Sequence, residues 1–302
     1  MHTDIKVLKN RKKINTYFKI LILFFILLFV FNISNCTKKT LTPGITLFEA
    51  IKKGNIDRVE EFIYTEVDLN TTETNEPYNT PLNLAVYEGN LKIVKLLLKQ
   101  KVDVNKSSSY WTPLHTSAYR GYSDILKLLI EAGASLEARS KPTNSTALNI
   151  AANNGKTECV KILIKSGASI SNLSLDLFGN LAAMGHFETI KTLVDAGVSI
   201  GIEDGKQSLL FASQKCHTEI VKFLLLQQID INSTDELGES ALYKATSSGC
   251  EPVITILINS KADPNLKTKF GETALASALS HKNPSPTIIQ ILRKAVGDEP
   301  IK

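Results

Sequence analysis

The sequence of 302 residues contains few cysteines, prolines and glycines, with counts of 4, 10 and 16. Four cysteines are too few for a small scaffold held together by disulfides, and the low proline and glycine content excludes collagen-like and low-complexity chains. Aromatic residues make up only 7% of the chain, but hydrophobic residues make up 43% of it. That hydrophobic fraction is enough to bury a large core and too high for a disordered chain, so the sequence predicts a folded protein.

Sequence motifs that carry catalysis are also missing. The chain has no glycine-rich phosphate-binding loop, no Gly-x-Ser-x-Gly, no His-Glu-x-x-His and no Cys-x-x-Cys. Two of its five histidines, His186 and His217, lie 31 residues apart with no third candidate ligand, whereas a metal site needs several ligands that converge. We therefore predict a protein that is not an enzyme, with no metal, no cofactor and no small-molecule substrate.

The formal net charge of +5 originates in the first 35 residues, which hold six of the 35 basic residues and one of the 30 acidic residues. The rest of the chain has 29 residues of each sign. A chain with balanced charge has no overall attraction for polyphosphate, so we predict that the protein does not bind nucleic acid.

Residues 1–35 have the layout of a secretory signal peptide. Basic residues from Lys6 to Lys19 precede an uninterrupted run of twelve apolar residues, Ile20 to Phe31. Twelve residues span about 18 Å as a helix, against about 30 Å for the hydrocarbon core of a bilayer, so the length disfavours a stable transmembrane helix. We therefore predict that residues 1–35 form a signal peptide.

The end of this segment, Ile33-Ser34-Asn35-Cys36, resembles the lipobox of bacterial lipoproteins. The resemblance implies cleavage before Cys36, acylation of Cys36 by palmitate or a similar lipid, and a lipid-anchored membrane protein on the periplasmic or surface face of the bacterial envelope. Residues 36–45 would form a polar tether, and several acyl chains would hold the protein durably on the membrane. Asn35 departs from the strict motif, which has Gly, Ala or Ser there. An ordinary signal peptide, giving a secreted protein, and an uncleaved signal anchor therefore stay open.

The rest of the chain repeats a unit of about 33 residues. Its clearest copy reads Thr-Pro-Leu-His from Thr112 to His115, reaches a turn at Gly121 and continues into the apolar run 125–130. The turn position recurs 30 to 35 residues apart, at Gly54, Gly89, Gly121, Gly155, Gly185, Cys216, Gly249 and Lys282. In motif and spacing, this unit closely resembles the ankyrin repeat.

The resemblance implies an all-α fold, an ankyrin-repeat solenoid of about eight units including caps. Each unit would be a pair of antiparallel helices, joined to the next by a β-hairpin-like loop, with Thr-Pro placing an N-cap hydroxyl and a first-turn proline. The ankyrin domain is expected over residues 46–296 and a tail over 297–302. The motif histidine hydrogen-bonds between repeats in the family, which implies a structural role for His115. We expect the solenoid to be a monomer.

Three cysteines lie in the repeats. Cys159 replaces an apolar residue of a second helix and is expected to act as a small core residue. Cys216 and Cys250 lie at adjacent turn positions, which in the ankyrin family stack about 10 Å apart, whereas the Cα atoms of a disulfide lie within about 7 Å of each other. We therefore expect no disulfide between them.

Ankyrin proteins bind other proteins in a concave groove lined by hairpin tips and first helices. The resemblance places at this groove the residue before each Thr-Pro position and the two residues before each turn. In this sequence these residues are Asn79, Tyr87, Glu88, Trp111, Tyr119, Arg120, Asn153, Asn154, Lys206, Gln214, Lys215, Glu239, Ser247 and Ser248.

Units 2 and 3 stand out because they hold the only tryptophan of the chain, Trp111, together with several tyrosines and Arg120. Tryptophan, tyrosine and arginine dominate the binding energy of many protein interfaces. The cluster is either the centre of the binding surface or a set of rings that packs the hairpins together, and the sequence leaves both open. Its tyrosines are Tyr78, Tyr87, Tyr110 and Tyr119.

These features predict a non-catalytic module that binds an unknown protein partner in its groove and is tethered to the bacterial envelope through the lipid on Cys36. The alternative is a secreted or host-directed ankyrin effector without a lipid anchor. An enzyme or a nucleic-acid binder on the same solenoid is disfavoured by the missing motifs and the balanced charge. The fold-level resemblance names no partner.

Overall fold

The computed structural model describes residues 46–65, 67–72, 80–108, 110–171, 173–281 and 285–298. The predicted signal peptide and tether, including the predicted lipidation site Cys36, lie outside the described residues. The same holds for Tyr78, Asn79 and the turn position Lys282, and for residues 299–302 of the predicted tail.

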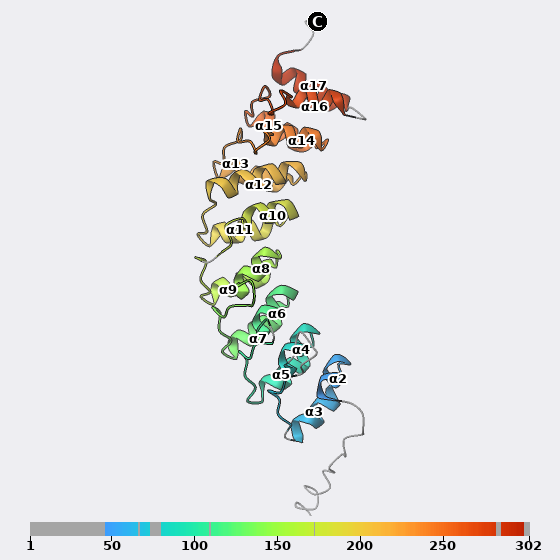
Figure 1. Ribbon diagram of the computed structural model, residues 1–302, viewed down its shortest axis with the longest axis vertical. Helices are drawn as coiled ribbons and strands as arrows, with labels where there is room; N and C mark the ends of the chain where they lie inside the picture. Colours follow the sequence, from blue (N-terminus) through green and yellow to red (C-terminus); the bar gives the residue numbers. More distant parts are fainter. Residues whose placement is uncertain are drawn as a thin grey trace, which may run out of the picture.

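The described residues form sixteen α-helices in eight antiparallel pairs, which stack into one elongated, curved solenoid (Figure 1). Even-numbered helices line the concave side and odd-numbered helices the convex side. Strands are absent from the described residues except for an isolated bridge between Thr234 and Ser240. The predicted all-α class and the eight units are therefore confirmed. The helices are α2 (Leu47–Lys52), α3 (Ile56–Tyr64), α4 (Pro81–Tyr87), α5 (Leu91–Leu98), α6 (Pro113–Arg120), α7 (Ser123–Glu131), α8 (Ala147–Asn153), α9 (Thr157–Lys165), α10 (Leu177–Met184), α11 (Phe187–Asp195), α12 (Ile202–Gln214), α13 (Thr218–Leu226), α14 (Ala241–Ser247), α15 (Glu251–Asn259), α16 (Ala274–Ser280) and α17 (Pro286–Val296).

Local sequence explains where the concave helices begin. The hydroxyl of Thr80 accepts a hydrogen bond from the Asn83 amide at 3.1 Å, and Ser240 caps α14 in the same way at 3.2 Å. Pro81 fills the first helical position, where its missing N–H costs nothing. These caps satisfy amides that have no partner inside a helix, so each unit starts its first helix at a defined residue.

A single hydrophobic core runs along the whole stack. The convex helices contribute large residues such as Ile93 and Leu97, both fully buried, at helical spacing. The concave helices contribute small residues such as Ala151 and Ala152, which let neighbouring units approach closely. Because each unit covers the apolar face of the next, stability depends on the interfaces between units as much as on the units themselves.

His115 joins unit 3 to the following hairpin. Its Nδ1 accepts the Thr112 amide at 3.2 Å, which places the proton on Nε2, and Nε2 lies 3.0 Å from the Ala138 carbonyl and 3.1 Å from the Ser145 carbonyl. The side chain is completely buried, and this burial lowers the pKa of His115 although both carbonyl contacts oppose the change. The predicted structural role of His115 is confirmed.

The turn edge of the solenoid is tightly packed, because in units 2 to 6 the first residue after the turn covers the turn of the preceding unit. At Gly185, which has a φ of +78°, an added Cβ would lie only 2.8 Å from the imidazole of His217. At Gly155 it would overlap the ring of His186. Glycine is therefore required here both by the left-handed backbone and by the close approach of the next unit.

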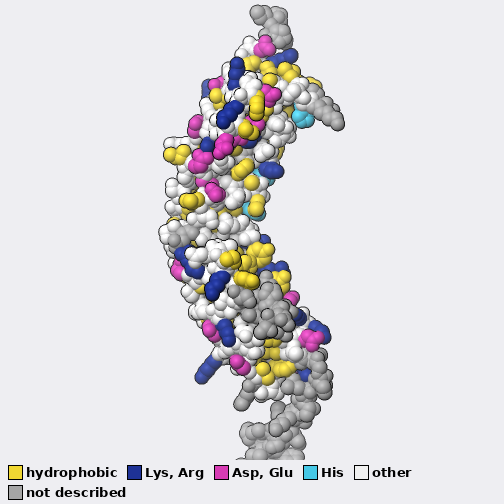
Figure 2. Space-filling model, viewed as in Figure 1, with side chains coloured by type: hydrophobic (Ala, Val, Ile, Leu, Met, Phe, Trp, Pro, Cys, Tyr) yellow, Lys and Arg dark blue, Asp and Glu magenta, His cyan; other side chains and the backbone are white. Residues whose placement is uncertain are grey.

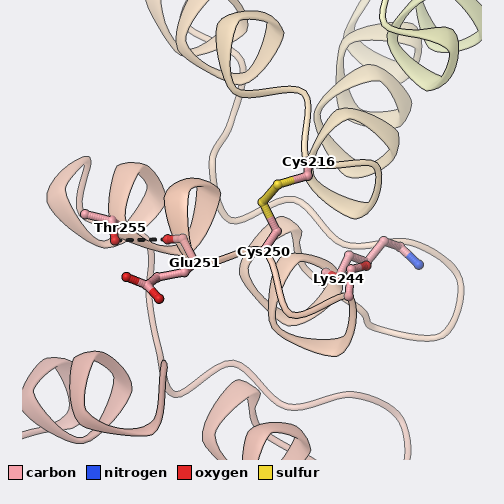
Figure 3. Close-up of a disulfide and its surroundings, with 6 residues drawn as sticks. Cys216, Lys244, Cys250, Glu251 and Thr255 are labelled. Atoms are coloured by element: carbon pink, nitrogen blue, oxygen red, sulfur yellow. Dashed lines mark hydrogen bonds between the residues drawn. A yellow bond between two sulfur atoms is a disulfide. The ribbon is translucent and has the colours of Figure 1, made fainter. Parts of the chain in front are cut away.

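Cys216 and Cys250 form a disulfide across this edge, with Cα atoms 5.6 Å apart (Figure 3). The expectation of no disulfide was wrong, because Cys250 does not occupy a turn position but follows the turn residue Gly249. It leans over the preceding turn, as His217 leans over Gly185. Cys216 occupies the glycine position of that turn with a φ of +64°. Because Cys250 of the next unit lies directly over this turn, the two sulfur atoms are close enough to form the disulfide. Cys159 is a free, buried thiol, as expected for a core residue; burial and the neighbouring Glu158 raise its pKa to about 11.

Unit 5 lacks the Thr-Pro motif, and a residue of the next unit caps its first helix instead. The two carboxylate oxygens of Asp204 accept the amides of Phe178 at 3.1 Å and Gly179 at 2.7 Å. Asp204 can reach them because α12 has 13 residues and begins already at Ile202. Burial raises the pKa of Asp204, although the two amides act in the opposite direction. The sequence motif gave no signal for this cap between units.

Candidate protein-binding surface

The predicted aromatic cluster lies at the concave side of units 2 and 3. Tyr87 ends α4, Tyr119 and Arg120 end α6, and Trp111 precedes the N-cap of α6. Because α4 and α6 pack side by side, the ends of these helices bring the four side chains to one region of the surface. The structure therefore brings Arg120 of unit 3 against Tyr87 of unit 2, which lies 33 positions earlier in the sequence.

Trp111 and Tyr119 form a tilted ring pair with centroids 5.0 Å apart. Trp111 is half-buried, and its carbonyl accepts hydrogen bonds from the side chains of Asn83 and Ser108, both at 2.8 Å. Tyr119 keeps 42% of its surface exposed. Trp111 therefore anchors the hairpin through its backbone, as the packing interpretation of the cluster predicts, and its ring contacts the more exposed ring of Tyr119.

Arg120 links the two units through its guanidinium group. Its central carbon lies 4.8 Å from the ring centre of Tyr87 and 5.5 Å from that of Tyr122, and Nη2 donates to the Tyr122 hydroxyl at 3.0 Å. A cation over an aromatic ring contributes about 0.5–1 kcal/mol at exposed sites. The sequence did not predict Tyr122 as a member of this cluster. The sequence feature that could have identified Tyr122 is its position directly after the turn residue Gly121.

Asn83 was also missed, although it holds the cluster in place. It stands where His115 stands in the next unit, and its amide group donates to the Trp111 carbonyl. The Thr116 hydroxyl in turn donates to the amide oxygen of Asn83 at 2.6 Å. Asn83 is completely buried, so these bonds replace the histidine contacts of unit 3 and fix the position of Trp111.

The other predicted residues of units 2 to 4 surround this cluster. Tyr110 is 55% exposed at the hairpin tip, and its carbonyl accepts the amide of Lys141 at 3.0 Å. Glu88 is exposed after the end of α4. In unit 4, the Asn154 side chain donates to the Ile150 carbonyl at 2.8 Å, and Asn153 contacts the Ser174 hydroxyl at 3.3 Å. Both asparagines are thus already engaged within the solenoid.

The predicted residues of units 6 and 7 lie farther along the concave side, away from the cluster. Lys206 forms an ion pair with Glu203 at 2.7 Å, and Gln214 and Lys215 are exposed. The exposed residues Ser247 and Ser248 end the first helix of unit 7. The structure therefore does not gather all predicted residues into one site; it arranges them along one side of the solenoid.

Lys244 was missed by the sequence analysis, and it organises the hairpin of unit 7. Its Nζ lies 2.6 Å from a Glu239 oxygen and 2.8 Å from an Asp235 oxygen. Burial acts to lower the pKa of Lys244, but the hydrogen bonds to the two carboxylates outweigh it and raise that pKa. Lys244 therefore stays charged and fixes the hairpin through ion pairs with Asp235 and Glu239. Glu239, one of the residues predicted to line the groove, is thus already paired within the solenoid.

No group of three or more His, Cys, Asp or Glu side chains within the described ranges is placed to hold a metal ion. The helices in the same part of the chain reach at most 13 residues, and none has the length and hydrophobicity needed to cross a membrane.

Comparison with known proteins gives the family. The family described as "Ankyrin repeats (3 copies)" matches residues 47–140, 136–204 and 209–300, which is well over half of the chain.

Among curated proteins, the chain is 31% identical over 109 residues to the mouse B-cell lymphoma 3 protein homolog, a match that covers 35% of this chain and 23% of that protein. It is 28% identical over 102 residues to a putative ankyrin repeat-containing protein of Treponema pallidum, covering 33% of this chain and 34% of the relative. A third relative, mouse ankyrin repeat and SAM domain-containing protein 6, is 28% identical over 36% of this chain and 13% of its own length. The chain thus spans between 13% and 34% of the length of these relatives.

Solved structures support the same assignment. The human ASB11 ankyrin repeat domain superposes with a TM-score of 0.61 at 25% identity, covering 74% of this chain and all of that domain. The ankyrin repeat domain of Bcl-3 superposes with a TM-score of 0.54 at 27% identity, covering 72% of this chain and all of that domain. The chain therefore belongs to the ankyrin-repeat family, whose fold is a non-enzymatic scaffold for protein–protein interaction.

Proposed function

We propose that this ankyrin-repeat protein captures a protein partner at the aromatic cluster of units 2 and 3, and that a lipid on Cys36 tethers it to the bacterial envelope. The observation that carries the binding proposal is Arg120, whose guanidinium group lies over the rings of Tyr87 and Tyr122 and which directly follows the exposed Tyr119 in the sequence.

The cluster suits a binding centre because it is held in shape before any partner arrives. Asn83 and Thr116 fix the Trp111 backbone, and Trp111 supports Tyr119. A side chain that is already positioned loses less conformational entropy when a partner binds, so more of its contact energy contributes to affinity. Tyrosine and arginine combine a large apolar area with polar groups, as at the centres of many interfaces.

The proposed tether rests on the sequence around Cys36, and the disulfide supports export. Disulfides persist in oxidising compartments such as the periplasm and the cell surface, and they are rare in reducing cytoplasm. The Cys216–Cys250 bond is consistent with that environment.

The binding proposal predicts that Tyr119→Ala combined with Trp111→Ala abolishes capture of the partner. The measurement is affinity capture of envelope and host-surface proteins on the full-length protein, with bound proteins identified by mass spectrometry. Arg120→Glu is a second variant, because it reverses the central charge at an exposed position and leaves the Trp111 backbone bonds in place. Tyr64→Ala is the matched control, since Tyr64 is a largely exposed tyrosine on the convex helix α3. Unchanged capture by both cluster variants, with an intact helical circular dichroism signal, would contradict the proposal.

The tether proposal predicts that wild-type protein extracted from bacterial membranes has a mass beginning at Cys36 with acyl chains attached. In Cys36→Ala that mature, acylated species should disappear, because no thiol is left to receive the lipid. Intact-mass analysis of both proteins is the measurement. A wild-type protein that is cleaved but unacylated, or one that keeps residues 1–35, would contradict the lipid tether and leave a secreted or signal-anchored ankyrin protein.

A further inference from the structure

The disulfide between units 6 and 7 joins an exposed cysteine to a buried one. Cys216 and the two residues before it, Gln214 and Lys215, are exposed at the turn that follows α12. Cys250, the N-cap residue of α15 on the other side of the bond, is only 2% exposed. Exposed disulfides belong to the labile class that exchanges with thiols in solution. The two cysteines of this bond therefore differ in how accessible they are to such a thiol.

This difference in access determines which cysteine a thiol attacks. In thiol–disulfide exchange, a thiolate attacks one sulfur atom along the line of the S–S bond, and the other sulfur atom leaves. A thiolate reaches Cys216 from the side of the exposed turn. It would reach Cys250 only through the packed start of α15, where Val253 and Ile254 are fully buried. Cys216 is therefore the attacked residue, and Cys250 is the leaving group.

The charged side chains around the bond do not oppose this direction of attack. The Glu251 carboxylate and the Lys244 ammonium group both point away from the sulfur atoms (Figure 3). Lys215 and Glu219, which are exposed on either side of the turn along the chain, have opposite charges. The ring of His217 lies over the turn of the preceding unit. Access, rather than local charge, therefore selects the attacked sulfur atom.

The folded protein has room for the product at Cys216. A small thiol attached there lies at an exposed turn, whereas one attached to Cys250 would have to fit into the buried start of α15. The Cα atoms of the two cysteines are 5.6 Å apart, so the freed Cys250 thiol stays within reach of Cys216. Burial raises the pKa of Cys159 to about 11, so this third thiol stays protonated and does not compete.

We propose that the Cys216–Cys250 bond is a reversible thiol-exchange site, at which a low-molecular-weight thiol becomes attached to Cys216. The thiolate of the small molecule attacks the Cys216 sulfur, the bond to Cys250 breaks, and the Cys250 sulfur leaves as a thiolate that takes a proton from water. Cys250 reforms the disulfide by the reverse step and releases the small thiol. Neither direction consumes a further oxidant or reductant. The inference depends on neither the aromatic cluster nor the lipid tether.

Exchange at this site opens the covalent link between units 6 and 7. In units 2 to 6, the residue after the turn packs over the turn of the preceding unit, whereas in unit 7 this residue is bonded to it. The stability of a repeat stack depends on the contacts between neighbouring units. Loss of the bond weakens the attachment of units 7 and 8 and leaves the contacts among units 1 to 5 intact. Attachment of a thiol to Cys216 therefore makes α14 to α17 open more often.

Single-cysteine variants of the full-length protein test the direction of attack. Cys250→Ser leaves Cys216 as a thiol, and Cys216→Ser leaves Cys250. Each variant is incubated with oxidised glutathione, and peptide mass spectrometry follows the adduct on each cysteine, in folded protein and in urea. We expect the adduct to form at least tenfold faster on Cys216 than on Cys250 in the folded proteins, and at similar rates in urea. Wild-type protein treated with reduced glutathione and quenched with acid should likewise carry the adduct on Cys216.

Hydrogen exchange of the wild-type protein tests the consequence. After treatment with reduced glutathione, amides of α14 and α15 should exchange at least tenfold faster, while those of α5 and α7 stay unchanged. The double variant Cys216→Ser with Cys250→Ser is the matched control, because it has no bond to open and should not respond to the thiol. Three results would overturn the inference: a wild-type adduct mainly on Cys250, a bond that opens only in urea, or unchanged hydrogen exchange after the bond has opened.

Discussion

His115→Ala is expected to lower the free energy of unfolding by about 3–5 kcal/mol, because it leaves the Thr112 amide and the Ala138 carbonyl without their partner. The Ser145 carbonyl also loses its contact with His115 but keeps the Ser140 amide at 2.9 Å. Each buried polar group that loses its partner costs about 1–3 kcal/mol, and the cavity adds to that cost. Urea denaturation followed by circular dichroism measures the change. The effect should be large because His115 joins two units, so the variant weakens an interface as well as a helix.

His115→Asn is the matched control. Asparagine occupies the equivalent position in units 2 and 4, as Asn83 and Asn149, and Asn83 donates to a carbonyl of the next unit. We therefore expect His115→Asn to recover a clear part of the stability lost in His115→Ala. Equal stability of the alanine variant and the wild type would show that the bridge to the next hairpin contributes nothing measurable.

The pH dependence of stability should differ between wild type and His115→Asn. Burial lowers the folded-state pKa of His115, so the unfolded chain binds a proton at a higher pH than the folded chain does. Stability from neutral His115 is therefore present above the unfolded pKa of about 6.5 and is lost as the pH falls below it, by up to about 1.4 kcal/mol per pH unit. The pKa of His186 is also lowered, chiefly by burial. Because His186 is present in both proteins, the difference between their free energies of unfolding at each pH isolates the contribution of His115.

Reduction of the Cys216–Cys250 disulfide is expected to lower the stability of units 6 and 7 by about 3–4 kcal/mol. The bond joins residues 34 positions apart, and closing a loop of this length in the unfolded chain gives a stabilisation of that size. Thermal unfolding with and without reductant should show a lower midpoint for the reduced protein. Alkylation before and after reduction, read by mass, should reveal two additional reactive thiols only after reduction.

Serine and glycine replacements separate the disulfide from the backbone strain at Cys216. Its φ of +64° is left-handed, which costs a residue with a Cβ about 1–2 kcal/mol more than it costs glycine. We expect the oxidised wild type to be most stable, Cys216→Gly with Cys250→Ser to be intermediate, and Cys216→Ser with Cys250→Ser to be least stable. Identical midpoints for the wild type and the double serine variant would contradict a stabilising disulfide.

The repeat architecture could be predicted because its signals act within one unit. Thr80 and Thr112 precede helices because their side chains and the following prolines favour a helix start, and Gly121 marks a left-handed turn. Apolar residues at helical spacing, such as Ile93 and Leu97, indicate which face is buried. These preferences are local, so they are readable along the chain without knowledge of the neighbouring units.

The candidate site was predictable only in part. Trp111 contacts Tyr119, and Arg120 contacts Tyr87 of the preceding unit. Tyr122 was missed, since its contact with Arg120 depends on how units 2 and 3 stack.

The sequence by itself determined the fold class, the eight units and the aromatic character of units 2 and 3, because caps, turns and periodicity are properties of short segments. The tertiary structure alone decided which residues of neighbouring units meet. It brings Cys250 onto the turn of Cys216 and carries Asp204 to the start of α10. The physical reason is that such contacts depend on the offset and tilt between stacked units. A shift of a few ångströms there changes which side chains touch, while the spacing of the repeat stays the same.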